Sequence, residues 1–247
     1  MKALILAAGY ATRLYPLTVN KPKALLPVSE NAVVLDLIVE KLEKLASVTQ
    51  ILIVTNHKYA GLFEEWLAGR ESGKEIKIID DGTTSVEDKR GAIGDLQFVI
   101  EQEQLQDDLF VLAGDNVFSF ELEPYVDYFY AVDRDCLLVK PTNDLEELRS
   151  IGVAEVDELG RVTALVEKPA EPRSNIGVYA LYLYKKETLK LVADYLEEGN
   201  SPDSPSHFPE WLVRQKDVRA YSADGGIYDI GTHEAYEEIR KLFAAGE

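Results

Sequence analysis

The sequence predicts an α/β fold whose first half is built on a parallel sheet. Four short apolar runs are typical of strands buried on both faces of a sheet. They occupy residues 3–7, 51–55, 76–79 and 109–113. Between them, apolar residues recur at helical spacing. These helical segments occupy residues 34–46, 59–67 and 93–105. Such alternation of strand and helix favours a parallel sheet with helices on both faces, because parallel strands are joined by crossover helices.

The second half is richer in strands and is expected to be partly antiparallel. Its predicted strands occupy residues 137–139, 153–156, 162–166 and 176–184. Glu158, Leu159 and Gly160 form a hairpin turn signal between two of these strands. Three helical stretches follow, at residues 186–197, 207–215 and 233–243. We therefore expect a single domain with a mixed central sheet.

Composition and charge exclude several classes of protein. The 247 residues are 46% hydrophobic, and 26 Lys and Arg against 44 Asp and Glu give a formal charge of −18. That charge disfavours binding to nucleic acid or to acidic membranes. The single cysteine, Cys136, cannot form an internal disulfide, and the N-terminal apolar run breaks at Gly9 before it could serve as a signal or membrane segment. We expect a cytoplasmic protein with no nucleic-acid or membrane partner.

Basic residues are concentrated at the start of this acidic chain. Residues 1–29 contain no Asp or Glu and carry four cations. These cations are Lys2, Arg13, Lys21 and Lys23. Small residues follow the first predicted strand, where backbone N–H groups can approach an anion closely. The segment therefore has the parts of a phosphate-binding turn, although a solvated loop with incidental basic residues would read the same way. Neither GxxxxGK[ST] nor GxGxxG occurs there, which argues against a P-loop NTPase and a dinucleotide-binding enzyme.

Five motifs in order resemble a known family. LAAGYATRLYPLT at residues 6–18 and KPKALLPV at 21–28 are followed by three shorter motifs. The shorter motifs are LAGDN at 112–116, VEKP at 166–169 and YDIGT at 228–232. Together they resemble the sugar-1-phosphate nucleotidyltransferases, or NDP-sugar pyrophosphorylases. The match covers nearly the whole chain and is closest in extent to the short members similar to glucose-1-phosphate thymidylyltransferases.

The resemblance implies a fold and a division of the chain. The expected fold is the Rossmann-like three-layer α/β/α nucleotidyltransferase fold, similar to the nucleotide-diphospho-sugar transferases, with a mixed central sheet. Within one catalytic domain of residues 1–247, residues 1–116 would form a nucleotide-binding half. Residues 117–247 would form a sugar-phosphate-binding half.

The resemblance also implies an activity, in which a sugar-1-phosphate attacks the α-phosphorus of an NTP and pyrophosphate leaves. The second pKa of a phosphate monoester is about 6, so no general base is required at neutral pH. Catalysis then rests on charge and positioning, with Arg13, Lys23 and Asp115 as the catalytic residues. Mg²⁺ would be held by Asp115 and Asp229 together with phosphate oxygens. Either aspartate alone could instead cap a turn.

The remaining expected contacts are carried over from the family position by position. For the nucleotide they are Leu6, Ala7, Ala8, Gly9 and Gly91. For the sugar phosphate they are Gly152, Glu167, Lys168, Val178 and Tyr182. From the residues alone, Glu167 and Lys168 would read equally well as a solvated strand end, and Val178 and Tyr182 as ordinary core.

Three departures from the family pattern leave the substrates open. The loop at residues 81–91 lacks the glutamine and the Pro-x-Gly-Leu-Ala run of the thymidylyl and uridylyl enzymes. Ala180 stands where the thymidylyltransferases have glycine, and residues 201–209 replace a more acidic segment. Two alternative functions stay open: a cytidylyltransferase for a phospho-alcohol such as phosphocholine, and a non-catalytic nucleotide-binding regulatory protein. The sequence is also compatible with a homo-oligomer and does not select a pathway or an allosteric control.

Overall fold

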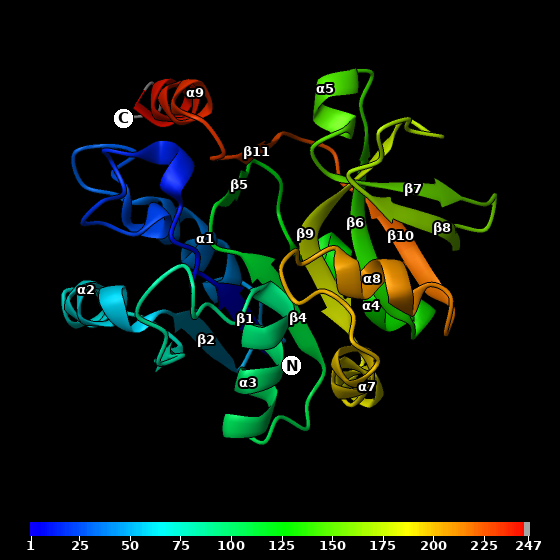
Figure 1. Cartoon of the computed structure of the whole chain (residues 1–247), viewed down its shortest axis with the longest axis horizontal. Coiled ribbons are helices and arrows are strands. Elements are labelled where there is room, and N and C mark those ends of the chain that lie inside the picture. The colour runs from blue at the N-terminus through cyan, green and yellow to red at the C-terminus, as the bar shows by residue number, and fades with distance from the viewer. Residues whose placement is uncertain (245–247) are drawn as a thin grey trace. The chain divides into compact units, whose positions relative to one another are not determined.

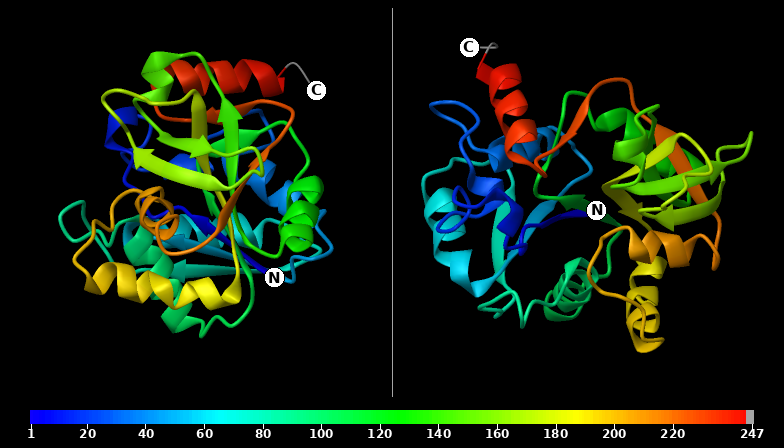
Figure 2. Two further views of the ribbon diagram at one scale, coloured as in Figure 1. Left: turned by 90° about the vertical axis from the view of Figure 1, so that its right-hand side faces the viewer. Right: turned by 45° about the horizontal axis from the view of Figure 1, so that its top comes forward.

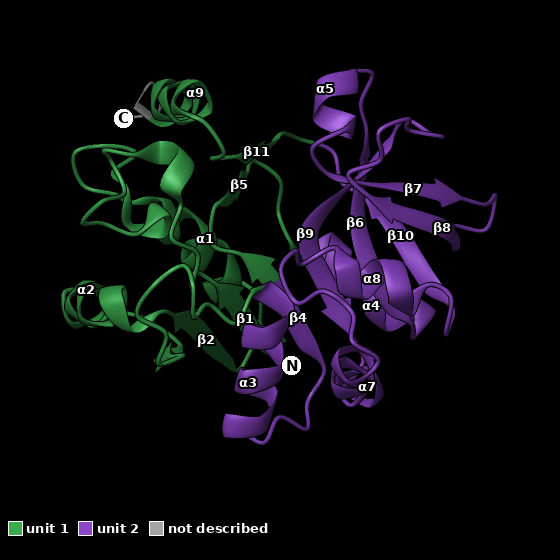
Figure 3. Ribbon diagram, viewed as in Figure 1, with its two compact units in different colours: residues 1–91, 112–122, 225–247 green, residues 92–111, 123–224 purple. Residues whose placement is uncertain are grey.

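The computed structural model describes residues 1–244, which form two compact units (Figure 3). Unit 1 contains residues 1–91, 112–122 and 225–244. Unit 2 contains residues 92–111 and 123–224. These unit boundaries differ from residue 116, where the resemblance implies a division into a nucleotide-binding and a sugar-phosphate-binding half, and that functional division stays a prediction. The chain passes from one unit to the other and returns, so that its last segment joins the first.

Unit 1 is built on a parallel sheet, as the sequence predicts (Figure 1). Strand β2 (Gln50–Thr55) lies between β1 (Lys2–Leu6) and β3 (Glu75–Asp80). Helix α1 (Val34–Glu43) follows β1, and helix α2 (His57–Ala68) packs against β2 and β3. The middle residues of β1 and nearly all of β2 are buried, which explains why both read as uninterrupted apolar runs.

A small two-stranded sheet in unit 1 is missing from the sequence prediction. Strand β5 (Asn116–Phe118) pairs antiparallel with β11 (Ile227–Asp229). Residues that face each other in this pair are at least 109 positions apart in the sequence. Helix α9 (His233–Ala244) packs against β11. Each strand has only three residues, too few for a periodic pattern to show. This pairing places the C-terminal segment in unit 1.

Unit 2 contains a mixed sheet. Its strands run in the order β10 (Val218–Ser222), β6 (Asp135–Pro141) and β9 (Ile176–Tyr184), with β7 (Gly152–Val156) paired to β9 and β8 (Val162–Glu167) paired to β7. The β10–β6 pair is parallel, and the β6–β9, β7–β8 and β7–β9 pairs are antiparallel. The β7–β8 hairpin can be followed in Figure 2. Its turn contains Gly160 with a φ of +76°, as the turn signal predicts.

Helices of unit 2 surround this sheet. They are α3 (Ala92–Gln102), α4 (Glu123–Val132), α5 (Leu145–Leu148), α6 (Lys186–Leu189), α7 (Leu191–Glu197) and α8 (His207–Leu212). Helix α4 packs against β10, and α8 packs against β8. The helix predicted for residues 186–197 is two helices that meet at Lys190, and α4 and α5 are absent from the prediction. Strand β4 (Leu109–Ala113), which has the predicted bounds, begins in unit 2 and ends in unit 1.

Two buried groups in unit 2 illustrate its core. Cys136 is fully buried with a free thiol, as expected, and burial raises its pKa. Its neighbour Asp135 is also fully buried, and its carboxylate is paired with Lys216 Nζ at 2.6 Å and accepts a hydrogen bond from Thr188. Burying a charge in this way is tolerable only with such partners. No helix within residues 1–244 is long and apolar enough to cross a membrane.

Candidate active site

The turn that follows β1 is held by its neighbours and left open on one side. The backbone N–H of Ala7 donates to Val54 O at 2.9 Å, and Asn56 Nδ2 donates to Ala8 O at 2.8 Å. Gly9 is exposed, and a Cβ added there would meet no atom within 4 Å. The turn is therefore fixed in place while its tip stays accessible. Such a backbone can approach an anion closely, as the sequence predicts for residues Leu6 to Gly9.

Ala11 closes this turn in a backbone conformation that alanine rarely adopts. It has a φ of 46° and a ψ of 44°, and its carbonyl accepts a hydrogen bond from Thr18 Oγ1 at 2.7 Å. Glycine adopts this left-handed conformation freely, whereas a Cβ makes it costly. A one-turn 3₁₀ helix, Thr12–Leu14, follows and carries Arg13. The Arg13 side chain is exposed and forms no hydrogen bond or ion pair within residues 1–244.

We expect Ala11→Gly to raise the free energy of unfolding by about 0.5–1 kcal/mol. Relief of the left-handed strain gains ~1–2 kcal/mol, and the greater freedom of glycine in the unfolded chain offsets part of it. Ala60→Gly, inside helix α2, is the control, because there glycine costs ~1 kcal/mol. Urea unfolding measures both variants. A loss of stability at both positions would contradict the strain at Ala11.

Asp115 is brought to the end of β1 by a close backbone approach. Gly114 N–H donates to Leu6 O at 2.9 Å, and a Cβ at Gly114 would lie 3.0 Å from that oxygen and 3.2 Å from the Ala7 Cβ. Only glycine fits this spacing without a shift of the turn. Asp115 is the next residue, so its position is tied directly to the end of β1.

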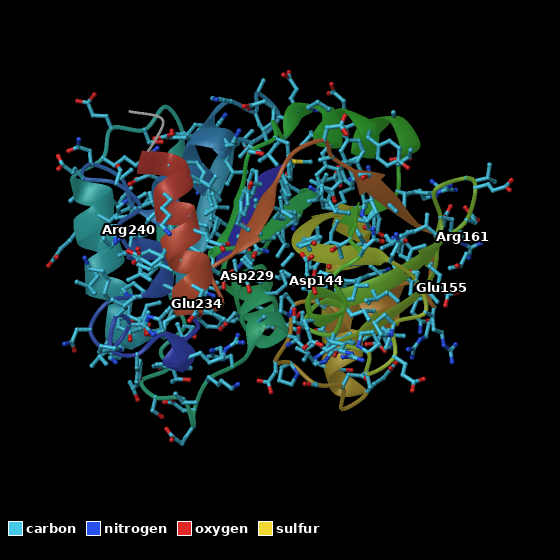
Figure 4. All side chains as sticks on the ribbon, turned by 90° about the horizontal axis from the view of Figure 1, so that it is seen from above. Asp144, Glu155, Arg161, Asp229, Glu234 and Arg240 are labelled. Atoms are coloured by element: carbon cyan, nitrogen blue, oxygen red, sulfur yellow. The ribbon has the colours of Figure 1, made fainter. Side chains whose placement is uncertain are left out.

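Asp229 reaches the same place through the β5–β11 pair. In the register of these strands Asp229 faces Asn116, the residue after Asp115, and Ile230 N–H donates to Asp115 O at 3.1 Å. Figure 4 shows Asp229 just before helix α9. Two aspartates that are 114 positions apart in the sequence are thereby held side by side, as the sequence analysis expects.

Lys23 bridges the two aspartates. Its Nζ lies 2.6 Å from Asp115 Oδ2 and 3.6 Å from Asp229 Oδ1, and its side chain is 14% exposed. Burial alone would lower the pKa of Lys23, but the two carboxylates outweigh it and raise that pKa. Desolvation and then the charge of Asp115 raise the pKa of Asp229, even though its side chain remains 53% exposed. The positive charge of Arg13 also acts on both Lys23 and Asp229, so all four groups form one electrostatic cluster.

This cluster corrects one expectation from the sequence. The acid-free N-terminal segment predicts a positively charged seat, but Lys23 is already engaged by two carboxylates. In formal charge, Arg13 and Lys23 cancel Asp115 and Asp229. The local cation without an ion pair within residues 1–244 is Arg13. A polyphosphate placed here would therefore need positive charge beyond what these four side chains supply.

The two aspartates suit a metal that takes few protein ligands. Within residues 1–244 no group of three or more His, Cys, Asp or Glu side chains is arranged to hold a metal. Mg²⁺ is commonly bound by only one or two carboxylates together with phosphate oxygens and waters. Desolvation, and after it the charge of Asp115, raises the pKa of Asp229, and a divalent cation stabilises carboxylates held close together. The residues present therefore fit the expected Mg²⁺ site.

The loop that ends at Gly91 is stiffened by one carboxylate. Asp88 accepts hydrogen bonds from the backbone N–H groups of Thr84 and Ser85 at 3.0 and 2.8 Å, which lower its pKa to about 2. Arg90 Nε donates to Asp81 O at 2.9 Å across the base of the loop. Gly91 has a φ of +80° and stands directly before helix α3. The loop is thus locally ordered, with glycine required at its exit.

In unit 2, three residues expected to bind the sugar phosphate lie in one row across the sheet. Gly152 on β7 faces Glu167 on β8 and Val178 on β9. A Cβ at Gly152 would lie 3.4 Å from Glu167 Oε2 and 3.5 Å from the Val178 Cβ. Tyr182 lies on the same strand as Val178, and both are buried. The strand register therefore brings Gly152, Glu167 and Val178 together.

Glu167 and Lys168 differ sharply in their surroundings. The Glu167 side chain is 6% exposed, and its Oε1 accepts a hydrogen bond from Ser204 Oγ at 2.7 Å. Its Oε2 is buried and has no hydrogen-bond partner within residues 1–244. Lys168 is 56% exposed, lies 3.4 Å from Glu167 Oε1, and has a φ of 46° directly before Pro169. A buried carboxylate with one unpartnered oxygen and a strained lysine beside it is an arrangement typical of a binding site.

Several residues that position these groups are absent from the sequence prediction. Gly114 and Gly231 lie inside the quoted motifs, and close contacts explain why glycine stands at both positions. A Cβ at Gly231 would lie 2.9 Å from Asp229 Oδ2. Asn56, Ser204 and Ser206 carry no sequence signal beyond their residue type. Asn56 holds Ala8, and the two serines come from a segment that reads only as a Pro- and Ser-rich loop. Their contacts are long-range and appear only in the folded chain.

Comparison with known proteins identifies the family. The mixed α/β fold brings Asp115 and Asp229 to Lys23, which with Arg13 follows the first strand. All four residues lie in the motifs that resemble the nucleotidyltransferases. Residues 2–245 match the family model described as nucleotidyl transferase. The chain belongs to this family.

Individual relatives are similar over almost all of this chain. It is 26% identical over 245 residues to a glucose-1-phosphate adenylyltransferase of Geobacillus stearothermophilus, covering 93% of this chain and 62% of that protein. It is 28% identical over 243 residues to a glucose-1-phosphate thymidylyltransferase of Streptomyces griseus, covering 98% of this chain and 66% of the relative. The matches cover between 49% and 66% of the length of the curated relatives.

A solved structure shows the same fold. The structure of a UDP-glucose pyrophosphorylase complexed with UDP-glucose matches all of this chain and 99% of its own, with a TM-score of 0.83 at 20% identity. The predicted fold class is therefore confirmed.

Proposed function

We propose that this protein is an Mg²⁺-dependent enzyme that transfers a nucleotidyl group from an NTP to a sugar-1-phosphate, giving an NDP-sugar and pyrophosphate. The observation that carries the proposal is the cluster after β1. There Lys23 contacts Asp115 and Asp229, and Arg13 forms no ion pair within residues 1–244. The relatives named above, which use glucose-1-phosphate by their names, support the same reaction class.

The proposed reaction needs no general base from the protein. With a second pKa of about 6, the phosphate of the acceptor is largely a dianion at neutral pH. Its oxygen forms a bond to the α-phosphorus while the bond from that phosphorus to the pyrophosphate oxygen breaks, so the electron pair leaves with pyrophosphate. The protein must bring two anions together and stabilise the departing charge. Arg13 can hold two phosphate oxygens in its planar fork, and Lys23 supplies a second donor.

Asp115 and Asp229 would hold the Mg²⁺. When bound, the ion would supply the positive charge that the neutral cluster lacks. The aspartates also keep Lys23 protonated and fixed between them. In this way the same two carboxylates orient a cationic side chain and bind the ion.

The residues of unit 2 would bind the acceptor. Glu167 can accept a hydroxyl hydrogen, and Lys168 can pair with the phosphate. Gly152 leaves space beside the carboxylate, because any Cβ there would contact Glu167 Oε2. Burial raises the pKa of Tyr182, so its hydroxyl remains neutral. Because the ring is also buried, Tyr182 does not offer an open aromatic face to a phosphocholine head group.

The test is a matrix assay of pyrophosphate release. Each NTP is combined with a panel of sugar-1-phosphates and with phosphocholine, with and without Mg²⁺. We expect release with at least one sugar-1-phosphate and only in the presence of the metal. Release with phosphocholine alone would support the cytidylyltransferase alternative. No release in any combination would support a regulatory binding protein and refute the proposal.

Lys168 offers a test that separates function from stability. We expect Lys168→Gly and Lys168→Ala each to raise the KM for the sugar-1-phosphate about tenfold, because both remove the charge that pairs with phosphate. Only the glycine variant should gain stability, by about 0.5–1 kcal/mol, since only it relieves the left-handed backbone. Steady-state kinetics and urea unfolding measure the two effects. Equal stabilities of the two variants would contradict strain at this position.

A further inference from the structure

A short segment of unit 2 connects the acceptor-side residues to helix α3. Residues 201–206, which we call the strap, lie between α7 and α8. The strap carbonyls of Pro202 and Asp203 accept hydrogen bonds from the backbone N–H groups of Ile93 and Ala92 at 2.8 and 3.3 Å. These two donors belong to the first turn of α3, which has no partner for them within the helix. The strap backbone is therefore anchored on a regular element.

Two serine side chains of the strap reach the row of residues on the sheet. Ser204 Oγ donates to Glu167 Oε1 at 2.7 Å, and Ser206 Oγ lies 3.0 Å from the Tyr182 hydroxyl. The Ser206 Cβ would also lie 3.5 Å from a Cβ at Gly152. The strap therefore contacts Glu167 and Tyr182, and its Ser206 Cβ lies beside the Cβ position of Gly152. Its backbone is held elsewhere, so these contacts do not depend on a bound ligand.

The hydrogen bond from Ser204 makes the two carboxylate oxygens of Glu167 different. Oε1 is occupied by Ser204 and faces Lys168 Nζ at 3.4 Å, whereas Oε2 has no hydrogen-bond partner. A carboxylate with one oxygen fixed in this way cannot rotate freely about its last torsion. Its free acceptor capacity is then directed toward Gly152, where the Cβ position lies 3.4 Å from Oε2. The unpartnered oxygen is the group that an acceptor hydroxyl would satisfy.

We propose that Ser204 is a positioning residue for acceptor recognition, which fixes the Glu167 carboxylate so that a single oxygen receives an acceptor hydroxyl. The proposal rests on the proposed function and names the residues that orient its acceptor-binding carboxylate. It also gives the Pro- and Ser-rich sequence of the strap a purpose. The prolines restrict its backbone, and Ser204 and Ser206 place hydroxyl groups at the two positions that face the sheet.

Kinetics of strap variants test the proposal. We expect Ser204→Ala to raise the KM for the sugar-1-phosphate about tenfold, the scale of one hydrogen bond to a charged group. The KM for the NTP should stay unchanged, and kcat should fall less than the acceptor KM rises. Ser204→Thr keeps the hydroxyl and should remain within about threefold of the wild type. Ser222→Ala, an exposed serine at the end of β10, is the matched control and should change neither constant.

A double-mutant comparison distinguishes positioning from general damage. If Ser204 acts through Glu167, Ser204→Ala should have no further effect on the acceptor KM in a Glu167→Ala background. An unchanged acceptor KM in Ser204→Ala, an equal rise in the NTP KM, or full additivity with Glu167→Ala would each overturn the proposal. Failure of the proposed function is a different result: the wild type itself would release no pyrophosphate with any sugar-1-phosphate. In that case calorimetry measures the binding of the same sugar-1-phosphates to the wild type and to Ser204→Ala. Equal affinities of the two proteins, or no binding by the wild type, would overturn the positioning role.

Discussion

Replacing Arg13 with alanine is expected to reduce turnover by about 10²-fold or more, the scale for losing one main group that stabilises transition-state charge. Stability should change little, because Arg13 is exposed and forms no ion pair or hydrogen bond within residues 1–244. The large effect on turnover follows from the charge balance of the cluster. Lys23 is engaged by two carboxylates, so Arg13 is the cation of the cluster that is free to meet the triphosphate. Pyrophosphate release under saturating substrates, together with thermal unfolding, measures the two quantities.

Two further variants sharpen this prediction. Lys21→Ala removes the same formal charge from an exposed position eight residues along the same acid-free segment, and we expect near wild-type turnover. Arg13→Lys keeps the charge but loses the planar fork, so its turnover should lie between the wild type and Arg13→Ala. Equal losses in Arg13→Ala and Lys21→Ala would show that overall charge matters and the position of Arg13 does not.

The sequence predicts the regular core of the fold well. Strands β4 and β9 have the predicted bounds, and the parallel β1–β2–β3 sheet follows from apolar runs that burial on both faces requires. Elements whose pattern is too short or whose partners are distant are missed. Strands β5 and β11 have three residues each and exist because they pair with each other across the chain. Because this pairing joins residues 227–229 to residues 116–118 in unit 1, the unit boundaries differ from the expected division at residue 116.

The candidate site divides in the same way. The identities of Arg13, Lys23, Asp115 and Asp229 come from ordered motifs, and the structure gathers them. The motifs do not show which of these side chains are already paired with one another. An acid-free segment suggests an open, positively charged site, yet the charge of Lys23 is balanced by Asp115, which directly precedes β5, and by Asp229 of β11. Local sequence records the cation but not its partner, because the partner is 92 or more positions away.

The acceptor side shows a further limit of sequence reasoning. Gly152, Glu167 and Val178 face one another because of strand register, which no single segment encodes. Ser204 and Ser206 belong to a segment whose composition indicates only a loop. Their positions depend on the hydrogen bonds that anchor Pro202 and Asp203 on α3. A positioning residue of this kind is recognised from contacts and not from its own sequence neighbourhood.

Asp115→Asn is expected to reduce turnover by about 10²-fold or more and to raise the Mg²⁺ concentration needed for half-maximal rate. The substitution keeps the shape of the side chain and removes its charge, so it weakens both the contact with Lys23 Nζ at 2.6 Å and the proposed metal ligand. Folding should survive, because Asp229 still lies 3.6 Å from Lys23 and is relieved of the repulsion from Asp115. Initial rates over a series of Mg²⁺ concentrations and thermal unfolding measure these effects.

The form of the Mg²⁺ dependence distinguishes the two roles of Asp115. If it binds the ion, excess Mg²⁺ should restore part of the lost rate in Asp115→Asn, because mass action compensates for a weaker site. If it only orients Lys23, the rate should stay low at every Mg²⁺ concentration, and the half-maximal concentration should match the wild type. Asp107→Asn, an exposed aspartate outside the cluster, provides the control and should behave as the wild type in both respects. Wild-type turnover in Asp115→Asn would show that this residue has no part in the mechanism. The close approach of Gly114 to the end of β1 would then have no catalytic explanation.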